Sequence, residues 1–295
     1  MLIVDLKTLC NSTTPIDYKM NLTQKKSNAE KGNFDNDILK QSAFKFVLLD
    51  KLSNKESNCL KENCIPISNL PDENINSQKN KSYIKQVKSK AYKSGKYAIT
   101  KKELIDINIK VANLEKRNPF LLPTIFQKGE YLKKDKMLYN IETGNFVKKA
   151  LKSNNNICQI DFKVDFFKKV KTTGYCILVI QEREIDPERI IYKFHEKGLD
   201  IYSSFCIDAF KKKYQLSGMQ FYILAVENNY KGNSVMFKLS ELSNEIGIES
   251  FKKRIKTIHN CYETNSFYGF QETSNPIKIS LNQTLIKRRE ANESW

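Results

Sequence analysis

The alternation of apolar and polar residues after Cys158 constrains the fold more than any other feature of the sequence. Apolar side chains take every second position, the period of a half-buried β-strand: Ile160, Phe162, Val164 and Phe166. A turn at residues 172–174 leads into a second apolar segment, 175–181, so the two segments predict a β-hairpin. Helical patterns lie on both sides of it, and the chain is therefore predicted to belong to the α+β class.

Three segments predict helices, two of them with a defined start. Residues 36–52 place their apolar side chains on one helical face. Thr100 and Glu103 have the spacing of a capping box, in which each side chain bonds an unpaired amide, and a helix is expected to start there. Asp186 caps a third helix, and Gly198 lies just past its end, where a left-handed residue is favoured.

The segment between the first two helices is polar and then basic. Residues 53–82 are rich in Asn and Ser and poor in apolar residues, which predicts a long loop or disordered linker. A run of nine lysines without an acidic residue begins near its end: Lys79, Lys81, Lys85, Lys88, Lys90, Lys93, Lys96, Lys101 and Lys102. We expect this run, with Lys85, Lys88 and Lys90, to bind nucleic-acid phosphates without regard to sequence.

The whole chain is strongly basic, with a formal net charge of +17. Residues 1–150 hold 28 Lys plus Arg and 16 acids, a net of +12, whereas 151–295 hold 22 and 17, a net of +5. Lys and Arg that neutralise phosphates release counterions, so nucleic acid is the leading class of partner. An AT-rich genome also encodes Lys frequently, and a solvated surface is the other interpretation.

Length and composition indicate how many domains the chain can form and in which compartment it is found. The 295 residues suffice for two domains, and their mean hydropathy is −0.54. No apolar stretch approaches the ~20 residues that cross a bilayer, and no export leader is apparent, so we expect a soluble, cytoplasmic protein without a membrane partner. Seven scattered cysteines indicate reduced thiols and not a disulfide framework.

Several enzyme classes lack the residues that their chemistry needs. The ten glycines are too far apart for a phosphate-binding loop, and the only two histidines are His195 and His259, without metal-site spacing. Cys59 and Cys64 form a close pair with no second pair to complete a zinc site. We therefore expect no cofactor, no metal and no catalytic residue.

The last third of the chain has an informative order of elements. Residues 205–230 are predicted mostly helical, 234–237 a short strand, and Gly247 the end of a brief helix. A second helix is predicted at 250–262, followed by a ribbon of two strands, 267–271 and 277–281. This is the order of a winged helix-turn-helix, whose last helix enters the major groove of DNA.

The helix predicted at 250–262 has two faces. Its apolar face would pack on the preceding helices: Phe251, Ile255, Ile258 and Tyr262. The other face and the ribbon supply donors for phosphates and base edges, and the predicted DNA-binding residues are Lys252, Lys253, Arg254, Lys256, Thr257, Asn260 and Lys278. An ordinary amphipathic surface helix would show the same pattern.

A family resemblance follows from the order and spacing of these residue types. The stretches 205–210, 214–224, 237–248 and 251–255 resemble the second winged helix of the initiator Rep proteins of iteron-type plasmids. The resemblance covers about 80 of the 295 residues, 205–281 in all. It implies two tandem winged-helix domains that bind repeated origin sequences in double-stranded DNA, act with host replication proteins, and repress their own gene as dimers. It also implies a binder and not an enzyme.

The sequence accordingly divides into five segments. They are an N-terminal helical segment (1–52), a polar linker with the lysine run (53–96), a first α+β domain (97–200), a C-terminal winged helix-turn-helix (201–286) and a basic tail (287–295). The function predicted is sequence-specific DNA binding in plasmid replication initiation.

Two alternatives stay open. A metal-dependent nuclease would need clustered carboxylates, and Asp161, Asp165, Glu182 and Glu184 lie on or near the predicted hairpin. Solvent-facing carboxylates are also usual on a half-buried strand. An RNA-binding protein would use the aromatic residues that interleave with the lysine run, such as Tyr83, Tyr92 and Tyr97.

Overall fold

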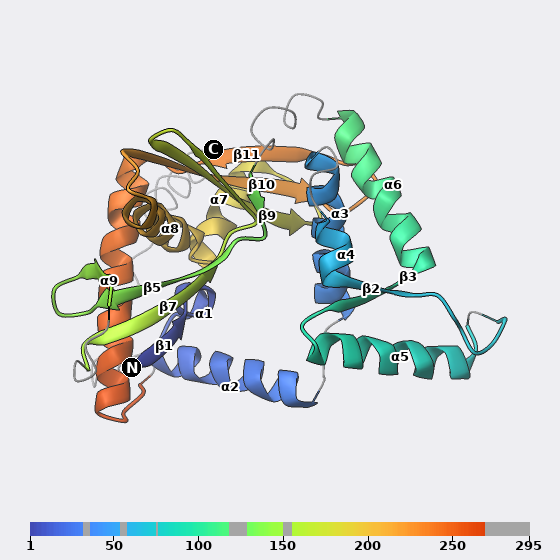
Figure 1. The fold of residues 1–295 in the computed structure, drawn as a ribbon, viewed down its shortest axis with the longest axis horizontal. Helices are drawn as coiled ribbons and strands as arrows, with labels where there is room; N and C mark the ends of the chain where they lie inside the picture. The colour runs from blue at the N-terminus through green and yellow to red at the C-terminus, as the bar shows by residue number, and fades with distance from the viewer. Residues whose placement is uncertain (32–35, 54–57, 75, 118–128, 150–154, 269–295) are drawn as a thin grey trace, which may run out of the picture.

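The computed structural model describes residues 1–31, 36–53, 58–74, 76–117, 129–149 and 155–268 (Figure 1). The helices are α1 (Leu6–Asn11), α2 (Pro15–Lys31), α3 (Asn36–Leu52), α4 (Cys59–Asn63), α5 (Gln78–Lys93), α6 (Lys101–Arg117), α7 (Pro187–Glu196), α8 (Leu199–Tyr214) and α9 (Glu241–Glu263). The strands are β1 (Leu2–Asp5), β2 (Cys64–Ile67), β3 (Tyr97–Thr100), β4 (Glu130–Tyr131), β5 (Lys134–Asn140), β6 (Asn145–Val147), β7 (Ile157–Lys163), β8 (Phe166–Val170), β9 (Thr173–Glu182), β10 (Gly218–Glu227) and β11 (Ser234–Lys238).

Strand β9 lies at the centre of a five-stranded mixed sheet with the order β11-β10-β9-β8-β4. It runs parallel to β10 and antiparallel to β8, and Cys176 is the register partner of Phe167. Cys176 packs into one hydrophobic core, whereas Ile177 and Val179 pack into another. Because both faces of the sheet are covered, the apolar run at 175–180 has no polar positions.

A second sheet has the order β1-β7-β5-β6. Strand β1 runs parallel to β7, with Val4 beside Ile160, and β5 runs antiparallel to both β7 and β6. The predicted hairpin therefore spans two sheets, since the chain leaves β7, bends at Val164 and Asp165, and enters β8 of the five-stranded sheet.

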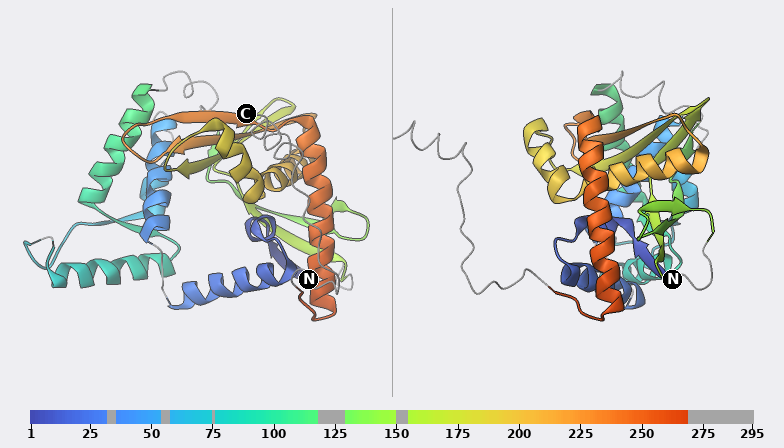
Figure 2. Two further views of the ribbon diagram at one scale, coloured as in Figure 1. Left: turned by 180° about the vertical axis from the view of Figure 1, so that it is seen from behind. Right: turned by 90° about the vertical axis from the view of Figure 1, so that its left-hand side faces the viewer.

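Helices cover the five-stranded sheet on both faces (Figures 1 and 2). Helices α1, α8 and α9 join both sheets in one core, with Phe205 and Phe251 fully buried in it. Helices α3 and α6 pack on the opposite face, where Leu48, Leu49 and Val111 meet the side chains of β9 and β10. A small parallel pair, β2 and β3, carries α5 at one edge of the molecule.

Several local predictions are confirmed. Helix α3 spans the predicted residues 36–52, and the hairpin turn lies between β8 and β9. The capping box forms, with the Glu103 amide donating to Thr100 Oγ1 (3.2 Å) and the Thr100 amide donating to Glu103 Oε2 (2.9 Å). Asp186 caps α7 by accepting a hydrogen bond from the Glu188 amide (3.1 Å). The α+β class is also confirmed.

The long linker predicted at 53–82 is wrong for its described part. Residues 59–67 form α4 and β2, and α5 begins at Gln78. The Asp50 carboxylate accepts hydrogen bonds from the backbone amides of Cys59 (2.7 Å) and Leu60 (3.0 Å). A polar composition misled the prediction here because the amides at the start of α4 are satisfied by a carboxylate from a neighbouring helix.

The predicted winged helix-turn-helix is not formed by the described residues. The segment predicted helical at 205–230 divides into α8 and the buried strand β10, whose apolar side chains face both cores. Helix α9 continues through Gly247, which therefore ends no helix. Apart from residues 267 and 268, the ribbon predicted at 267–281 lies outside the described residues.

Gly247 has a packing role instead. It lies where α9 crosses α8, and a Cβ there would stand 2.2 Å from Ser204 Oγ and 2.9 Å from the Asp200 carbonyl oxygen. Glycine is thus required here because α8 and α9 approach closely. A glycine in a helical pattern can therefore mark a helix crossing as well as a helix end.

None of the described helices is both long enough and apolar enough to cross a membrane.

Candidate nucleic-acid interface

Helix α5 is the most one-sided charged element among the described residues. Its sixteen residues include six lysines and no acid. Ala91, Ile84 and Val87 pack the helix on the β2–β3 pair. Five lysines are exposed on its outer side: Lys79, Lys81, Lys85, Lys90 and Lys93. Lys96, Lys101 and Lys102 extend the exposed positive charge toward the start of α6. We call this set of exposed lysines, on α5 and at the start of α6, the α5 edge.

Lys88 differs from the other lysines of α5. Its side chain is 8% exposed, and its ammonium lies 2.7 Å from Glu103 Oε1 of α6. Although burial opposes it, hydrogen bonds from Lys88 and Thr100 hold the pKa of Glu103 below its ordinary value. Of the three lysines singled out from this run, Lys85 and Lys90 are free to meet a phosphate, whereas Lys88 joins α5 to α6.

The residues predicted to read DNA from 250–262 lie along α9. Phe251, Ile255 and Ile258 are buried, as predicted for the apolar face, whereas Tyr262, predicted on the same face, is exposed. Thr257 is half-buried, and its hydroxyl donates to the Lys253 carbonyl oxygen (3.0 Å). The remaining candidates are exposed: Lys252, Lys253, Lys256 and Asn260. Lys278 lies outside the described residues.

Arg254 is turned inward. Its Nη1 donates to three backbone carbonyl oxygens around the end of α1, those of Leu9 (3.2 Å), Cys10 (2.8 Å) and Ser12 (2.7 Å). A charged donor that satisfies three carbonyl groups is held strongly. Its guanidinium thus joins α9 to α1.

The four carboxylates named for a metal-dependent nuclease each have a partner. The Asp161 carboxylate accepts a hydrogen bond from the side-chain Nε2 of Gln159 (2.7 Å), and the Glu184 carboxylate lies 3.5 Å from the Lys231 ammonium. Glu182 pairs with two lysines of α7 and its end, Lys193 and Lys197. The described residues contain no group of three or more His, Cys, Asp and Glu side chains that could hold a metal ion.

Asp165, at the bend between the two sheets, is the most buried of these carboxylates. Its side chain is 2% exposed, and its Oδ2 accepts from the Lys45 ammonium (2.8 Å) and the Val179 amide (2.8 Å). Burial, opposed by Asp165 and aided by Lys45, holds the pKa of the neighbouring Lys163 below its ordinary value. The surroundings of Asp165 are therefore cationic, since Lys45 and Lys163 both lie near its carboxylate.

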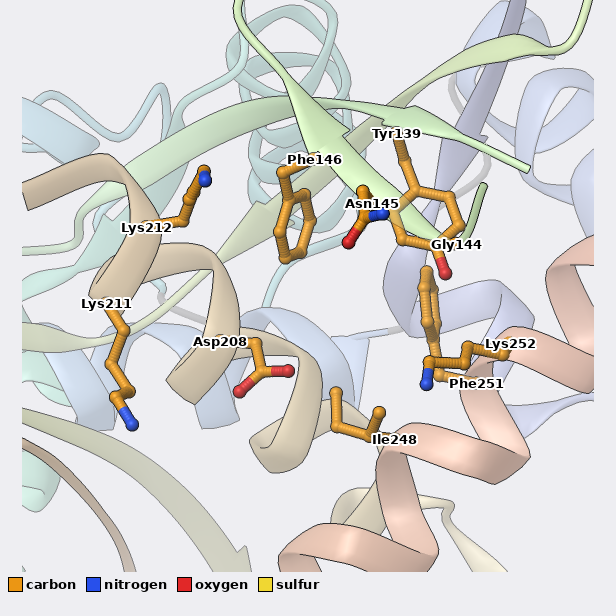
Figure 3. Close-up of a pocket in the computed structure, with 10 residues that line it drawn as sticks. All are labelled: Tyr139, Gly144, Asn145, Phe146, Asp208, Lys211, Lys212, Ile248, Phe251 and Lys252. Carbon is orange, nitrogen blue, oxygen red and sulfur yellow. The ribbon is translucent and has the colours of Figure 1, made fainter. Parts of the chain in front are cut away.

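A separate pocket opens between the β5–β6 hairpin, α8 and α9 (Figure 3). Its volume is about 420 Å³, and it is lined by Tyr139, Gly144, Asn145, Phe146, Asp208, Lys211, Lys212, Ile248, Phe251 and Lys252. Sequence reasoning missed this pocket except for Lys252, because its walls come from three separate segments of the chain, within 139–146, 208–212 and 248–252. The Gly144–Asn145 pair, a turn signal between two aromatic residues, could have indicated its hairpin.

The described fold is similar to that of a solved protein. No family model matches the chain, and no curated protein matches it. A structure of a proposed exonuclease from Eubacterium rectale matches with a TM-score of 0.50 and 8% identity, covering 96% of this chain and 92% of that chain. A second solved structure matches with a TM-score of 0.27 and 10% identity, over 71% of this chain and 84% of the other. This TM-score is too low to support any conclusion about the fold.

This match corrects the resemblance to plasmid replication initiators. The likeness extends over nearly the whole chain, whereas the resemblance rested on common residue types in 205–281. Both the expected initiator function and the expectation that the chain is not an enzyme depended on a winged helix. The described residues form no winged helix, so both expectations are corrected. At 8% identity the likeness concerns the fold alone.

Proposed function

We propose that the protein is a nucleic-acid enzyme of the nuclease type, whose substrate strand lies along the α5 edge. The observation that carries the proposal is the fold, which is similar over 96% of the chain to that of a proposed exonuclease. The charge of the chain agrees with such a substrate, since nucleic acid is the polyanion that a net +17 favours.

The α5 edge supports this choice of surface. Its exposed lysines have no acidic residue within the helix to neutralise them, so they are available to phosphates. Contacts of this kind position a strand but do not read its sequence. The protein is accordingly expected to act on many sequences.

The proposal assigns no catalytic step to a metal. The four carboxylates named for a metal site are bonded to ammonium or amide groups: Asp161, Asp165, Glu182 and Glu184. Cleavage therefore has to be measured both with and without a divalent metal, and the comparison decides whether the reaction depends on the metal.

The direct test is cleavage of oligonucleotides about 30 nucleotides long by the full-length protein. Single-stranded DNA, duplex DNA and RNA, labelled at the 5′ or the 3′ end, would be incubated with Mg²⁺, with Mn²⁺ or with EDTA and resolved by size. Shortening of at least one substrate is expected, and the two labels show from which end it proceeds. Intact substrates under every condition, at protein concentrations that bind them, would overturn the proposal.

A pair of variants tests the surface. Lys85→Ala with Lys90→Ala should lower kcat/KM by about threefold to tenfold, mainly through KM, because two phosphate contacts are lost. The matched control is Lys26→Ala with Lys238→Ala, which removes the same charge from two exposed lysines on other elements. Equal losses in the two double variants would show that net charge matters and that the α5 edge does not.

A further inference from the structure

The four-stranded sheet has a polar face that carries two neighbouring lysines. Along β7, Ile160 and Phe162 are buried in the core. Side chains alternate along a strand, so Asp161 and Lys163 lie on the opposite face, and both are half-buried. Lys134 of β5 is exposed and is the register partner of Lys163. Like charges directly opposite each other on paired strands are unfavourable, so this pair of lysines lacks a structural benefit.

A third lysine reaches the end of this face from α3. The Lys45 ammonium lies 2.8 Å from Asp165 Oδ2, at the bend that follows β7, and 21% of its side chain is exposed. An ammonium has three donors, and among the described residues Asp165 accepts from one of them. The Asp165 side chain is only 2% exposed, so it fixes Lys45 in place without itself facing solvent. Lys45 is therefore held at the protein surface with donors left for a ligand.

Lys7 of α1 belongs to the same group. Desolvation by the surrounding protein lowers the pKa of Lys7, and the charges of Lys45 and Lys25 lower it further, although two nearby aspartates oppose this. Lys7 is nevertheless exposed. A side chain that keeps its access to solvent while protein surrounds it lies on a concave surface. Burial also lowers the pKa of Lys163, and Lys45 and Lys7 contribute to this. We call Lys7, Lys45 and Lys163, which influence one another in this way, the inner lysines.

The exposed acids near the inner lysines already have partners. Asp5 accepts a hydrogen bond from the Thr8 amide (2.8 Å) and lies 3.0 Å from the Lys25 ammonium. Asp161 accepts from Gln159 Nε2 (2.7 Å). These acids do not balance the lysines around them. The whole group has a net charge of +3, from six lysines and three aspartates: Lys7, Lys25, Lys45, Lys134, Lys136 and Lys163 against Asp5, Asp161 and Asp165.

The inner lysines come from elements that follow one another around an arc (Figures 1 and 2). Helix α2 contacts α1 and α5, and β3 contacts α5 and α3. Lys7 and Lys163 lie at the end of the arc formed by α1 and β7, and Lys45 lies at the end formed by α3. The α5 edge belongs to the same arc, between these two ends. The arc therefore carries two groups of lysines that are separate in the sequence.

We propose that the inner lysines bind backbone phosphates of the nucleic-acid strand, as a second contact beside the α5 edge. Phosphate supplies the counter-charge that a group of mutually repelling ammonium ions lacks. Ammonium groups are point charges that contact phosphates without reading a base, so the site is expected to accept any sequence. This inference deepens the proposed function and rests on it for the class of substrate, but binding can be measured without cleavage.

The first test measures the acetylation rate of individual lysines in the full-length protein by mass spectrometry. The probe is a thymidine oligonucleotide about 30 nucleotides long, and the controls are the same strand with an uncharged methylphosphonate backbone and inorganic phosphate at equal phosphate concentration. We expect the charged strand to slow acetylation of Lys7 and Lys163 at least about fivefold, and that of the exposed Lys238 and Lys256 less than about twofold.

Three results of this test would overturn the inference. Unchanged acetylation of Lys7 and Lys163 would show that the strand does not reach them. Equal protection by the uncharged strand would show that phosphate charge is not what the site binds. Equal protection by inorganic phosphate would show a site for a small anion and not for a strand.

A double variant measures the contribution of the inner lysines to affinity. Lys7→Gln with Lys163→Gln should weaken binding of the oligonucleotide by about tenfold to thirtyfold at about 0.1 M salt, because each phosphate contact on a single strand contributes about 0.7 to the salt slope. Tm should stay or rise, since the two changes remove charges that repel Lys45. A lower Tm would indicate a structural role instead. Lys45 is left unchanged because its loss would leave the Asp165 carboxylate buried without a cation.

The matched control is Lys238→Gln with Lys256→Gln, which removes the same charge from exposed positions on β11 and α9. It should change the affinity by less than about threefold. Equal losses in the two double variants would show that the net charge of the chain, and not the inner lysines, sets the affinity.

The outcomes separate the two proposals. If strands are cleaved but the Lys7 and Lys163 double variant binds them as the wild type does, the inference about the inner lysines fails and the nuclease-type function stands. If the strand protects the inner lysines but no substrate is cleaved, the proposed function fails and the phosphate contact stands.

Discussion

Helices α5 and α9 both carry clusters of basic residues, yet they use them differently. Helix α5 has six lysines and no acid, a net of +6. Helix α9 has Lys252, Lys253, Arg254 and Lys256 against four glutamates, Glu241, Glu245, Glu249 and Glu263, a net of zero. One cation of α9 is turned inward and another pairs with a glutamate of its own helix. A basic stretch therefore indicates a surface for a polyanion only where its Lys and Arg side chains are not already paired with acidic or carbonyl groups of the protein itself.

The largest expected effect that tests this comparison comes from Arg254. Arg254→Met keeps much of the side-chain volume but leaves three carbonyl oxygens near α1 without their donor. The free energy of unfolding should fall by about 2–4 kcal/mol. Lys253→Met, on the same helix and exposed, should change it by less than about 0.5 kcal/mol. Urea titrations of the three proteins measure both values, and equal stabilities would show that Arg254 is not structural.

A smaller effect concerns the salt dependence of nucleic-acid binding. Two lost phosphate contacts should lower the slope of log K against log salt by about 1.4 on single-stranded DNA, which is the change expected for Lys85→Ala with Lys90→Ala. Lys253→Ala with Lys256→Ala should alter the slope less, because α9 carries no net charge. Anisotropy titrations between about 0.05 and 0.2 M salt give both slopes. A larger change in the α9 variant would reverse the assignment of the two helices.

The smallest effect lies between α5 and α6, at the Lys88–Glu103 pair. The pKa of Glu103 is lowered in the folded protein, so its stabilisation is present above the ordinary carboxyl pKa and is lost as pH falls through the lowered value. The wild type should therefore lose about 1 kcal/mol more than Glu103→Gln when pH falls from 7 to about 3. Thermal unfolding at both pH values measures this difference. Parallel losses would mean that the pair contributes no measurable stability.

Local sequence features predicted much of the fold. The ends of α3, the capping box of α6 and the hairpin turn before β9 depend on residues close in the chain, and sequence patterns describe such structure well. Strand β10 was misassigned as helix because it is buried on both faces, and a continuous apolar run has no period that separates strand from helix.

The candidate sites were harder to predict, for a physical reason. Gly247 suggested a helix end because its contact with α8 is invisible in the sequence. The lysine run predicted the α5 edge, but nothing near Lys88 or Arg254 revealed that their partners are Glu103 and the carbonyl groups near α1. The pocket around Tyr139 depends on residues brought together only by the tertiary fold.

The bond between Arg254 and Leu9 joins residues 245 positions apart. At a synthesis rate of roughly 5–20 residues per second, Arg254 of α9 is made roughly 12 to 50 s after Leu9 of α1. Val4, Leu6 and Leu9, which are fully buried in the folded protein, gain part of their cover from β7 and α8 and the rest only when α9 has been made. The nascent chain is thus expected to be a client of chaperones until α9 emerges, and the completion of α9 sets the moment at which its main core can close.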